Sequence, residues 1–504
     1  MRVPPDVRRL PQASRADNES WAAVSKRCFP ADNACRLRDF PVVPVPRRSL
    51  QGEWSHYAFL VLALGGASVG FGNLWRFPGL VLEFGGGAFV LVYLASLLLL
   101  GLPVLLAEMV VGRSGHQAPV QAFSSVALLH GHSRYWGLAG LLPLLGGLLL
   151  LGGLSVVAGW SLGYVFRALG GAIARMDVID ATALFHNLTS DPERGIAWLS
   201  VFLGAATMVV VCGLRRGIEP FAKTAVPLML VGMLVLVVHA LDSHELGMAW
   251  KRAFEVDWSR LDGEAYLAAL RHGFYSLAVG VGVAAAYAAC LDDRHPLASS
   301  AVAVVVLDTL FALAATLLVV TLLEAGAVDF RPGLRLLFET LPMILGQLAG
   351  GSFIAVVLFT ILVLAALATA VALLEAIVAS VVERGDLRRP AATLFVVAIA
   401  WVLAVAGVLS FSIWEEWYPL GLIPALESAT PFELLNRVAM FVILPLAALA
   451  ALVFVGWILP RETLLYALGW RGGRWFSLCY LGIRFVAPLL LILVFLEGLN
   501  LIGP

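Results

Sequence analysis

The stretch Gly65-Gly66-Ala67-Ser68-Val69-Gly70-Phe71-Gly72-Asn73-Leu74-Trp75-Arg76-Phe77-Pro78 interrupts an apolar segment that is long enough to cross a bilayer. Its glycines release the backbone from helical dihedral angles, and Pro78 ends the stretch without an amide donor. Inside a membrane, non-helical backbone is tolerated only where protein buries it or where it lines a watery cavity. The stretch therefore predicts a binding site. Its freed carbonyls can hold a cation, and the amides of a half-helix N-terminus can hold an anion.

The composition indicates an all-α membrane protein with many spans. Of 504 residues, 60% are hydrophobic and 13% are charged, whereas soluble domains carry about 25% charged residues. The apolar runs are continuous and of helix length, which disfavours an outer-membrane barrel with its short alternating segments. The formal net charge is zero, so a nucleic-acid partner has no electrostatic support.

About eleven segments approach the ~20 apolar residues that a span requires. The first 50 residues are polar and rich in Pro and Arg, lack a signal-peptide core, and are predicted to form a disordered cytoplasmic tail. Alternate short loops are rich in arginine, which places the N-terminus in the cytoplasm. The candidate spans lie near 56–82, 88–112, 136–169, 195–213, 220–240, 265–290, 297–324, 350–383, 391–409, 433–458 and 476–498.

A second interruption, from Ser276 to Gly282, falls in the sixth candidate span. Paired interruptions at matching positions of two halves are typical of inverted-repeat transporters. The alternative is that these glycines only allow close helix packing. Two interruptions five spans apart, the first followed by Asn73 and Arg76, favour a binding site. The first repeat would then occupy 51–240 and the second 241–459.

Several further segments carry a family resemblance. The chain resembles the neurotransmitter:sodium symporters, especially their bacterial amino-acid-transporting members, and is a divergent example. The resemblance implies a 5+5 inverted-repeat core with broken helices 1 and 6, one extra helix at 460–504, and substrate uptake driven by sodium across a bacterial-type inner membrane. The segments that carry it are Trp54 to Phe89, Ser155-Val156-Val157-Ala158-Gly159-Trp160, Arg216-Gly217-Ile218-Glu219-Pro220-Phe221-Ala222-Lys223 and Phe338-Glu339-Thr340-Leu341-Pro342.

By this resemblance, the first sodium site would use the Ser68 carbonyl, the Asn73 side chain, and the hydroxyl and carbonyl of Ser276. Its last ligand would be Asp308, where the family usually has asparagine. A carboxylate inside a membrane is costly and is by default a functional candidate. The alternative for Asp308 is a protonated or capped acid that packs against its neighbours.

The second sodium site would use the carbonyls of Gly66, Val69 and Ala365 and the hydroxyl of Thr369. Ala368 stands where relatives have a second oxygen-bearing side chain. Because one ligand is lost, binding of one sodium ion and binding of two both remain possible. The resemblance implies no organic cofactor.

The resemblance also identifies the residues that match a chloride site: Tyr93, His272, Ser276 and Ala312. Ala312 supplies neither a charge nor a hydroxyl. We therefore expect Asp308 to provide the negative charge, which would make transport chloride-independent. His272 could titrate near neutral pH, so proton coupling is an alternative; a simple interface histidine is another.

The substrate cavity implied by the resemblance suits a small apolar amino acid. The amides of the first interruption would bind the substrate carboxylate beside the first sodium. Gly70 replaces the aspartate of amine transporters, which disfavours a monoamine. Leu154 replaces a tyrosine and Ala278 a serine, so the cavity is more apolar than usual and a non-amino-acid substrate is an alternative. The lining residues would be Ser68, Phe71, Gly72, Leu154, Tyr275, Ala278, Val281, Thr369 and Leu373.

Two gates follow from the same resemblance. At the outer gate, Arg76 faces Asn436 in place of an aspartate, and Glu433, one turn earlier on the same helix face, could take over. At the inner gate, Trp54, Tyr287 and Glu383 match the family. Several inner positions differ, and weaker contacts there would favour the inward-open state. Gln51 replaces an arginine, for which Arg47 or Arg48 could substitute; Cys290 replaces a tyrosine; and Glu375 is an additional mid-span acid.

Other functional classes have less support. The chain contains no His-Glu-x-x-His motif. Its two Gly-x-Ser-x-Gly runs, at 66–70 and 159–163, lie inside apolar candidate spans and not at a strand-to-helix turn, which argues against an enzyme. Altered coupling through Asp308, Glu375 or His272 is an alternative within the same fold, and a channel or a regulatory membrane protein is a less favoured one. The expected partners are a small-molecule substrate and the lipid bilayer; the sequence does not distinguish a monomer from a homodimer.

Overall fold

The computed structural model describes residues 49–502 except 296, 329–332, 386, 422–426, 471 and 500. Residues Met1–Val43 cluster apart from Pro44–Pro504, and the following description concerns the second unit. Nearly all of the predicted cytoplasmic tail, including Arg47 and Arg48, lies outside the described residues.

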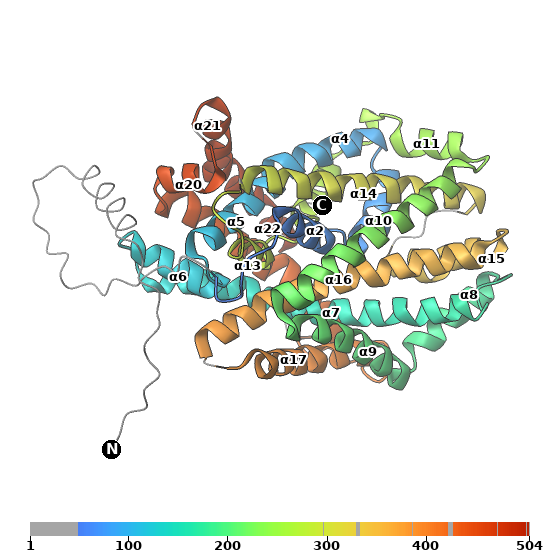
Figure 1. Ribbon diagram of the computed structural model, residues 1–504. Coiled ribbons are helices and arrows are strands. Elements are labelled where there is room, and N and C mark those ends of the chain that lie inside the picture. Colours follow the sequence, from blue (N-terminus) through green and yellow to red (C-terminus); the bar gives the residue numbers. More distant parts are fainter. Residues whose placement is uncertain are drawn as a thin grey trace, which may run out of the picture. The chain divides into compact units, whose positions relative to one another are not determined.

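The described chain is helical, with one isolated antiparallel bridge between Gly86 and Val256 (Figure 1). Within it, nine helices are long and apolar enough to cross a membrane, or ten if one bent pair is a single span. The shorter α12 and α13 form one further interrupted span, in agreement with the predicted number. The repeat boundaries at 51–240, 241–459 and 460–504 stay a prediction. The first five spans contain α2 (Tyr57–Ser68), η1 (Gly72–Arg76), α3 (Phe77–Glu83), α4 (Gly87–Ser96), η2 (Leu97–Gly101), α5 (Leu102–Gly115), α7 (Gly137–Leu169), α9 (Pro192–Val211), η4 (Leu214–Ile218) and α10 (Glu219–Leu241).

The later spans begin with the second broken helix. They contain α12 (Gly263–Tyr275), α13 (Val283–Ala288), α14 (Leu297–Ala325), α16 (Gly351–Gly385), α17 (Arg389–Leu409), α18 (Pro431–Arg437), η8 (Val438–Ile443), α19 (Leu444–Val453), η9 (Phe454–Ile458), α21 (Arg474–Leu481), η10 (Gly482–Val486) and α22 (Ala487–Gly498). Shorter helices connect the spans: α6 (Pro119–Leu129), η3 (Arg134–Trp136), α8 (Val178–Thr189), α11 (Leu246–Phe254), η5 (Trp258–Arg260), η6 (Leu336–Thr340), α15 (Leu341–Gln347) and α20 (Arg461–Leu468).

Both predicted interruptions are breaks in the helices. The first span ends its first half at Ser68, and the second half leaves at 55° to it. In the sixth span, seven residues separate α12 from α13, and Ala278, Gly280 and Gly282 have positive φ angles of 49°, 78° and 74°. Glycine adopts this region freely, whereas Ala278 is strained in it. The two breaks leave backbone groups without helical partners at the centre of the fold.

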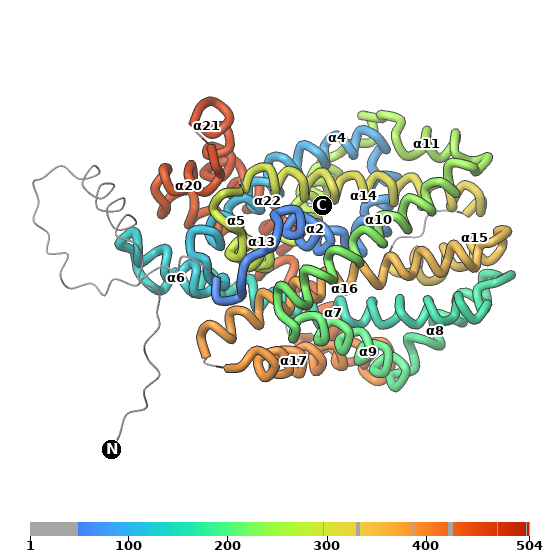
Figure 2. Tube along the Cα trace, viewed as in Figure 1, coloured from blue at the N-terminus to red at the C-terminus, as the bar shows by residue number. Residues whose placement is uncertain are grey.

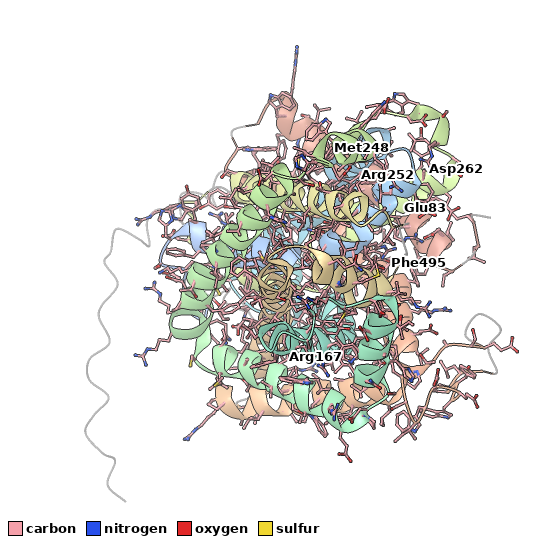
Figure 3. All side chains as sticks on the ribbon, turned by 90° about the vertical axis from the view of Figure 1, so that its right-hand side faces the viewer. Glu83, Arg167, Met248, Arg252, Asp262 and Phe495 are labelled. Atoms are coloured by element: carbon pink, nitrogen blue, oxygen red, sulfur yellow. The ribbon has the colours of Figure 1, made fainter. Side chains whose placement is uncertain are left out.

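The first broken span lies among helices that are distant in the sequence. Its α2 packs against α10, α13, α14 and α16, and Figure 2 shows its dark blue tube among them. Figure 3 looks onto one end of the bundle, where Glu83 ends the first span and Asp262 precedes the sixth. Arg252 of α11 also lies at this end (Figure 3), and its ion pair of 2.5 Å with Glu324 joins α11 to α14.

The second span and the inner half of the sixth span pack in close backbone contact. A Cβ atom added at Gly112 would lie 1.9 Å from the carbonyl oxygen of Ala285. We expect Gly112→Ala to lower the free energy of unfolding by about 3 kcal/mol, the upper end of the usual cost of overpacking. Thermal unfolding of the purified protein measures this effect. Gly204→Ala is the control, since its Cβ would meet no atom within 4 Å; equal unfolding midpoints for the two variants would contradict the prediction.

Candidate functional site

A buried polar cluster lies where the two broken spans face each other. Asp308 of α14 is completely buried, and its Oδ1 accepts a hydrogen bond of 2.7 Å from Asn73 Nδ2. Its Oδ2 accepts hydrogen bonds from Ser276 Oγ at 2.5 Å and from Tyr93 Oη at 3.4 Å. The structure thus brings together three predicted side-chain ligands of the first sodium site. A carboxylate, an amide oxygen and a hydroxyl are hard oxygen donors of the kind that hold sodium in broken-helix transporters.

The first break also exposes backbone oxygens beside this cluster. Ser68 is the last residue of α2, and its hydroxyl donates to the Leu64 carbonyl at 3.0 Å. Because the helix ends there, the carbonyls of its last turn lack the intrahelical partners of a continuous helix. Phe71 and Gly72 follow at the break and are half-buried. The Ser68 carbonyl and the nearby amides are therefore available in the position that the sequence predicts.

His272 lies on the same side of the cluster. Its ring is stacked on Phe77 at a centroid distance of 5.1 Å and lies 5.4 Å from the ring of Tyr93. A Cβ atom added at Gly72 would lie 3.8 Å from His272 Cε1. The buried His272 Nε2 has no hydrogen-bond partner among the described residues. Of the predicted chloride-site residues, Tyr93, His272 and Ser276 thus lie close together.

The predicted second sodium site lies where α2 meets α16. Thr369 Oγ1 donates to the carbonyls of Ala67 at 3.0 Å and Ala365 at 3.1 Å. A Cβ atom added at Gly66 would lie 3.5 Å from the Ala368 Cβ. Val69, the residue directly after α2, has a non-helical ψ of 88°. The alanine at 368 therefore leaves an apolar wall where relatives supply an oxygen.

The predicted substrate residues come from several elements. Val281 and Leu373 both approach Gly147 of α7: the Val281 carbonyl lies 3.6 Å, and a Leu373 methyl group 3.3 Å, from a Cβ placed there. Leu154 of α7 and Ala278 of the second break are half-buried apolar residues. The Tyr275 hydroxyl donates to the Met440 carbonyl of η8. The Tyr275 phenol thus connects the sixth span to the tenth.

At the outer gate, the structure does not join Arg76 to either predicted partner. Asn436 Nδ2 donates to the Phe432 carbonyl at 2.8 Å. Glu433 forms a capping box with Thr430 at the start of α18, so its carboxylate satisfies the N-terminus of its own helix. Arg76 has no ion-pair partner within the described residues. Another ion pair, between Arg271 of α12 and Glu497 of α22, connects the sixth span to the last one.

At the inner gate, Trp54 and Tyr287 are in direct contact. Trp54 Nε1 donates to the Tyr287 carbonyl at 2.9 Å, and the two rings meet edge to face with centroids 5.4 Å apart. Glu383 Oε2 accepts from the Ala118 amide at 2.8 Å. The buried Cys290 Sγ lies 3.6 Å from Ser49 Oγ. Trp54 therefore packs on the sixth span at the predicted inner gate.

Arg389, which sequence analysis did not assign to a gate, connects three elements at this end. Its Nη1 donates to Gln51 Oε1 at 2.7 Å, and its Nε donates to the Val210 carbonyl of α9 at 2.9 Å. Its Nη2 forms an ion pair with the buried Glu375 of α16. Arg389 of α17 thus places a guanidinium beside Gln51. The predicted substitution by Arg47 or Arg48 lies outside the described residues and stays a prediction. The mid-span acid Glu375, which required a basic partner, was the signal that could have identified it.

A second unassigned residue supports the break in the sixth span. Glu108 of α5 is buried, and its Oε1 accepts from the Gly280 amide at 2.7 Å. Its Oε2 has no partner among the described residues. A carboxylate within the second candidate span was the sequence signal. Glu108 holds one amide that the unwound backbone would otherwise leave unpaired.

The loop after α13 is held by the inner end of α5. Arg113 Nε lies 3.3 Å from Asp293 Oδ1, and His116 Nε2 lies 3.6 Å from the same oxygen. The His116 imidazole, and to a smaller extent Arg113, lower the pKa of the Asp293 carboxyl below its usual value, although partial burial opposes them. Since an Asp with a lowered folded-state pKa loses its stabilising contribution as the pH falls through that value, these contacts stabilise the loop more at neutral pH than in acid.

Comparison with known proteins assigns the family. The profile of the Sodium:neurotransmitter symporter family matches residues 51–176 and 190–503. An uncharacterized sodium-dependent transporter of Haemophilus influenzae is 25% identical over 453 residues, which cover 88% of this chain and 98% of the relative. Another, from Bacillus subtilis, is 26% identical and covers 90% and 98%.

A solved structure agrees. The crystal structure of MhsT in complex with L-phenylalanine matches with a TM-score of 0.80 and 30% identity, over 89% of this chain and 99% of that one. The fold class, with its broken helices 1 and 6 in a 5+5 inverted-repeat core, is confirmed at this level. The family consists of transporters and not of enzymes. The chain belongs to the sodium:neurotransmitter symporter family.

Proposed function

We propose that the protein imports a small apolar amino acid together with sodium by alternating access. The observation that carries the proposal is the buried cluster of Asn73, Ser276 and Asp308 at the two facing breaks. Sodium bound there would place a positive charge beside the amides of the first break, and together they attract a substrate carboxylate. The half-buried apolar residues Leu154 and Ala278 favour an apolar side chain, and MhsT was solved with L-phenylalanine.

We infer that transport does not require chloride. Asp308 lies 3.4 Å from the Tyr93 hydroxyl and 2.5 Å from the Ser276 hydroxyl, both of which match chloride-site positions. An ionised Asp308 carboxylate would therefore supply the negative charge that chloride would otherwise supply beside sodium. Replacing chloride by gluconate should leave uptake unchanged.

The direct test is uptake into proteoliposomes. Candidates first found by thermal shift in sodium against potassium are then offered as labelled substrates under an inward sodium gradient. We expect an apolar amino acid such as phenylalanine or leucine to accumulate with sodium and not with potassium. Accumulation that is equal in sodium and potassium would contradict sodium coupling, and a severalfold stimulation by chloride would contradict chloride independence.

Ala368 provides a test of the second sodium site. The Ala368→Ser variant adds a hydroxyl to the apolar wall that faces Gly66. A Cβ atom placed on Gly66 would lie 3.5 Å from the Ala368 Cβ. One added oxygen ligand is worth about 1 kcal/mol, so the sodium concentration for half-maximal uptake should fall about fivefold. Uptake measured against sodium concentration gives this value. Ala366→Ser, at a buried position of the same helix, is the control. An unchanged sodium concentration for half-maximal uptake in Ala368→Ser would show that residue 368 does not face the second sodium site.

A second candidate function, proton coupling in the same fold, has one specific observation in its favour. His272 Nε2 is buried and has no hydrogen-bond partner among the described residues, and the ring faces Gly72. Histidine can change charge near neutral pH. Uptake driven by a pH gradient in the absence of sodium would support this alternative, and uptake that follows sodium alone would exclude it.

We place the N-terminus in the cytoplasm and the protein in a bacterial-type inner membrane, on the basis of the arginine-rich loops. The proposed ligands are one or two sodium ions and a small substrate. Size-exclusion chromatography with light scattering distinguishes the monomer from the homodimer.

A further inference from the structure

An arginine lies well inside the last span. Arg484 belongs to η10 and follows Arg474, the first residue of the 474–498 span, by ten residues. At ~1.5 Å per residue this places its Cα about 15 Å along the helix. An arginine at such a depth is costly and requires a partner.

The described residues satisfy only some of the hydrogen-bond donors of Arg484. Nη1 donates to Tyr480 Oη at 2.7 Å. The buried Nε has no hydrogen-bond partner, and no carboxylate forms an ion pair with the guanidinium among the described residues. The charge instead lies over three rings, with centroids at 5.6 Å for Trp457, 5.7 Å for Tyr480 and 5.5 Å for Phe485. Such cation–π contacts stabilise the cation but do not neutralise it.

A second guanidinium also lies close to the same tyrosine. Arg461, at the start of α20, lies 5.5 Å from the Tyr480 centroid and 5.1 Å from that of Phe476. Its Nη2 donates to Ser477 Oγ at 3.2 Å. The two arginines therefore share one aromatic side chain, which places both on one side of α21 and η10. We call Arg461, Arg484, Phe476, Tyr480 and Trp457 the arginine–aromatic site.

The surrounding sequence carries an excess of positive charge. The segment from 457 to 486 has four arginines and one acidic residue, Glu462. Glu462 is exposed and forms no ion pair with the described arginines. An anion from outside the chain is needed to balance the arginine–aromatic site.

The position of the site selects the kind of anion. A Cβ atom added at Gly456 would lie 3.1 Å from Arg484 Cα, so the two backbones are in contact and the arginine side chain must extend along the aromatic rings. Trp475 and Tyr466, which are 79% and 73% exposed, are residues typical of the membrane–water interface. Long arginine side chains reach from the apolar region to that interface. The ligand therefore belongs to the headgroup layer.

We propose that the arginine–aromatic site binds the phosphate of an anionic membrane phospholipid. The planar guanidinium of arginine matches phosphate oxygens with two parallel hydrogen bonds. The acyl chains of the lipid would lie on the exposed apolar residues of the last span, Leu481, Phe485 and Leu489. This site is separate from the substrate and sodium sites and does not depend on the proposed function.

The test is lipid binding by the purified, delipidated full-length protein. Phosphatidylglycerol or phosphatidylcholine is titrated into the micelles, thermal unfolding is followed, and native mass spectrometry counts the retained lipids. We expect phosphatidylglycerol, and not phosphatidylcholine, to raise the unfolding midpoint of the wild type. The Arg461→Gln/Arg484→Gln variant should need at least about tenfold more phosphatidylglycerol for half of the effect, the loss of roughly one charge-assisted contact.

Matched variants keep this test sharp. Arg474→Gln removes an exposed arginine of the same helix outside the site and should stay close to the wild type. Arg461→Gln alone, at an exposed position, gives an intermediate result even if the double variant folds poorly. If Arg474→Gln and the double variant lose the effect of phosphatidylglycerol equally, the lipid is attracted by the general surface charge and not by the arginine–aromatic site. If inorganic phosphate alone raises the unfolding midpoint as much as phosphatidylglycerol does, the site binds free phosphate and the lipid proposal is wrong.

Discussion

Replacing Asp308 by asparagine should reduce sodium-driven uptake at least about tenfold, because a contact to a charged group is worth about 1.5–3 kcal/mol. The substitution keeps the size of the side chain but removes the only carboxylate in contact with Asn73, Ser276 and Tyr93 in the described cluster. Without that charge, the oxygens at the two breaks attract sodium less strongly. The sodium-dependent rise in the unfolding midpoint should fall in parallel, since a ligand that binds more weakly stabilises the folded state less.

The same variant also tests the role of Asp308 as the fixed anion. If its charge replaces chloride, chloride should partly restore uptake in Asp308→Asn while it leaves the wild type unchanged. Glu324→Gln is the matched control, since Glu324 is a carboxylate at the other end of the same helix that pairs with Arg252. Uptake by Asp308→Asn within twofold of the wild type would rule out a requirement for the negative charge of Asp308.

Replacing Arg389 by glutamine should open the inner side of the protein. The variant loses the contact to Gln51 and leaves the buried Glu375 without its partner. Removing one partner of a buried ion pair costs about 3–5 kcal/mol, part of which appears as lower stability and part as a shift toward the inward-open state. Cys290 is 3% exposed and reports this opening. Its alkylation without substrate should be at least about tenfold faster in the variant, which corresponds to a shift of about 1.4 kcal/mol.

Three controls separate gating from stability in a background where the other four cysteines are serine. Arg388→Gln removes the neighbouring exposed arginine and should change neither the unfolding midpoint nor the rate of Cys290 alkylation. Arg389→Gln/Glu375→Gln removes the unpaired acid and should recover stability while Cys290 stays reactive. Gln51→Ala removes only the contact to the segment before α2 and should also raise the reactivity. Slow alkylation of Cys290 in every one of these variants would show that Arg389 has no part in the gate.

The sequence predicts the parts of this protein that depend on local pattern. Two glycine-rich interruptions in apolar runs indicated the breaks near Ser68 and between Tyr275 and Val283, because no other residue frees the backbone so easily. The family resemblance then placed Asn73, Ser276 and Asp308 together, as the structure does. Their roles as sodium ligands stay a prediction.

The contacts that sequence analysis missed join elements that are far apart in the chain. Arg389 and Glu375 are both visible as charged residues, but the contact between Arg389 and Gln51 spans more than three hundred positions and leaves no periodic signal. Glu433 shows a different failure. Its spacing from Thr430 is that of a capping box, so a local function competed with the predicted gate, and the local function is the one observed. The direction of the Tyr275 phenol depends on the tenth span in the same way.

The contacts of α5 with the second break and with α13 determine which parts can move separately. Glu108 holds the Gly280 amide in the break, and Gly112 lies against the Ala285 carbonyl of α13, so two successive turns of the second span are attached to the sixth span. These two helices should therefore move as one rigid body, and the conformational change should occur in the segments around them. Paired spectroscopic probes on the two helices would keep a constant separation throughout the transport cycle, while the distance from either helix to α16 changes.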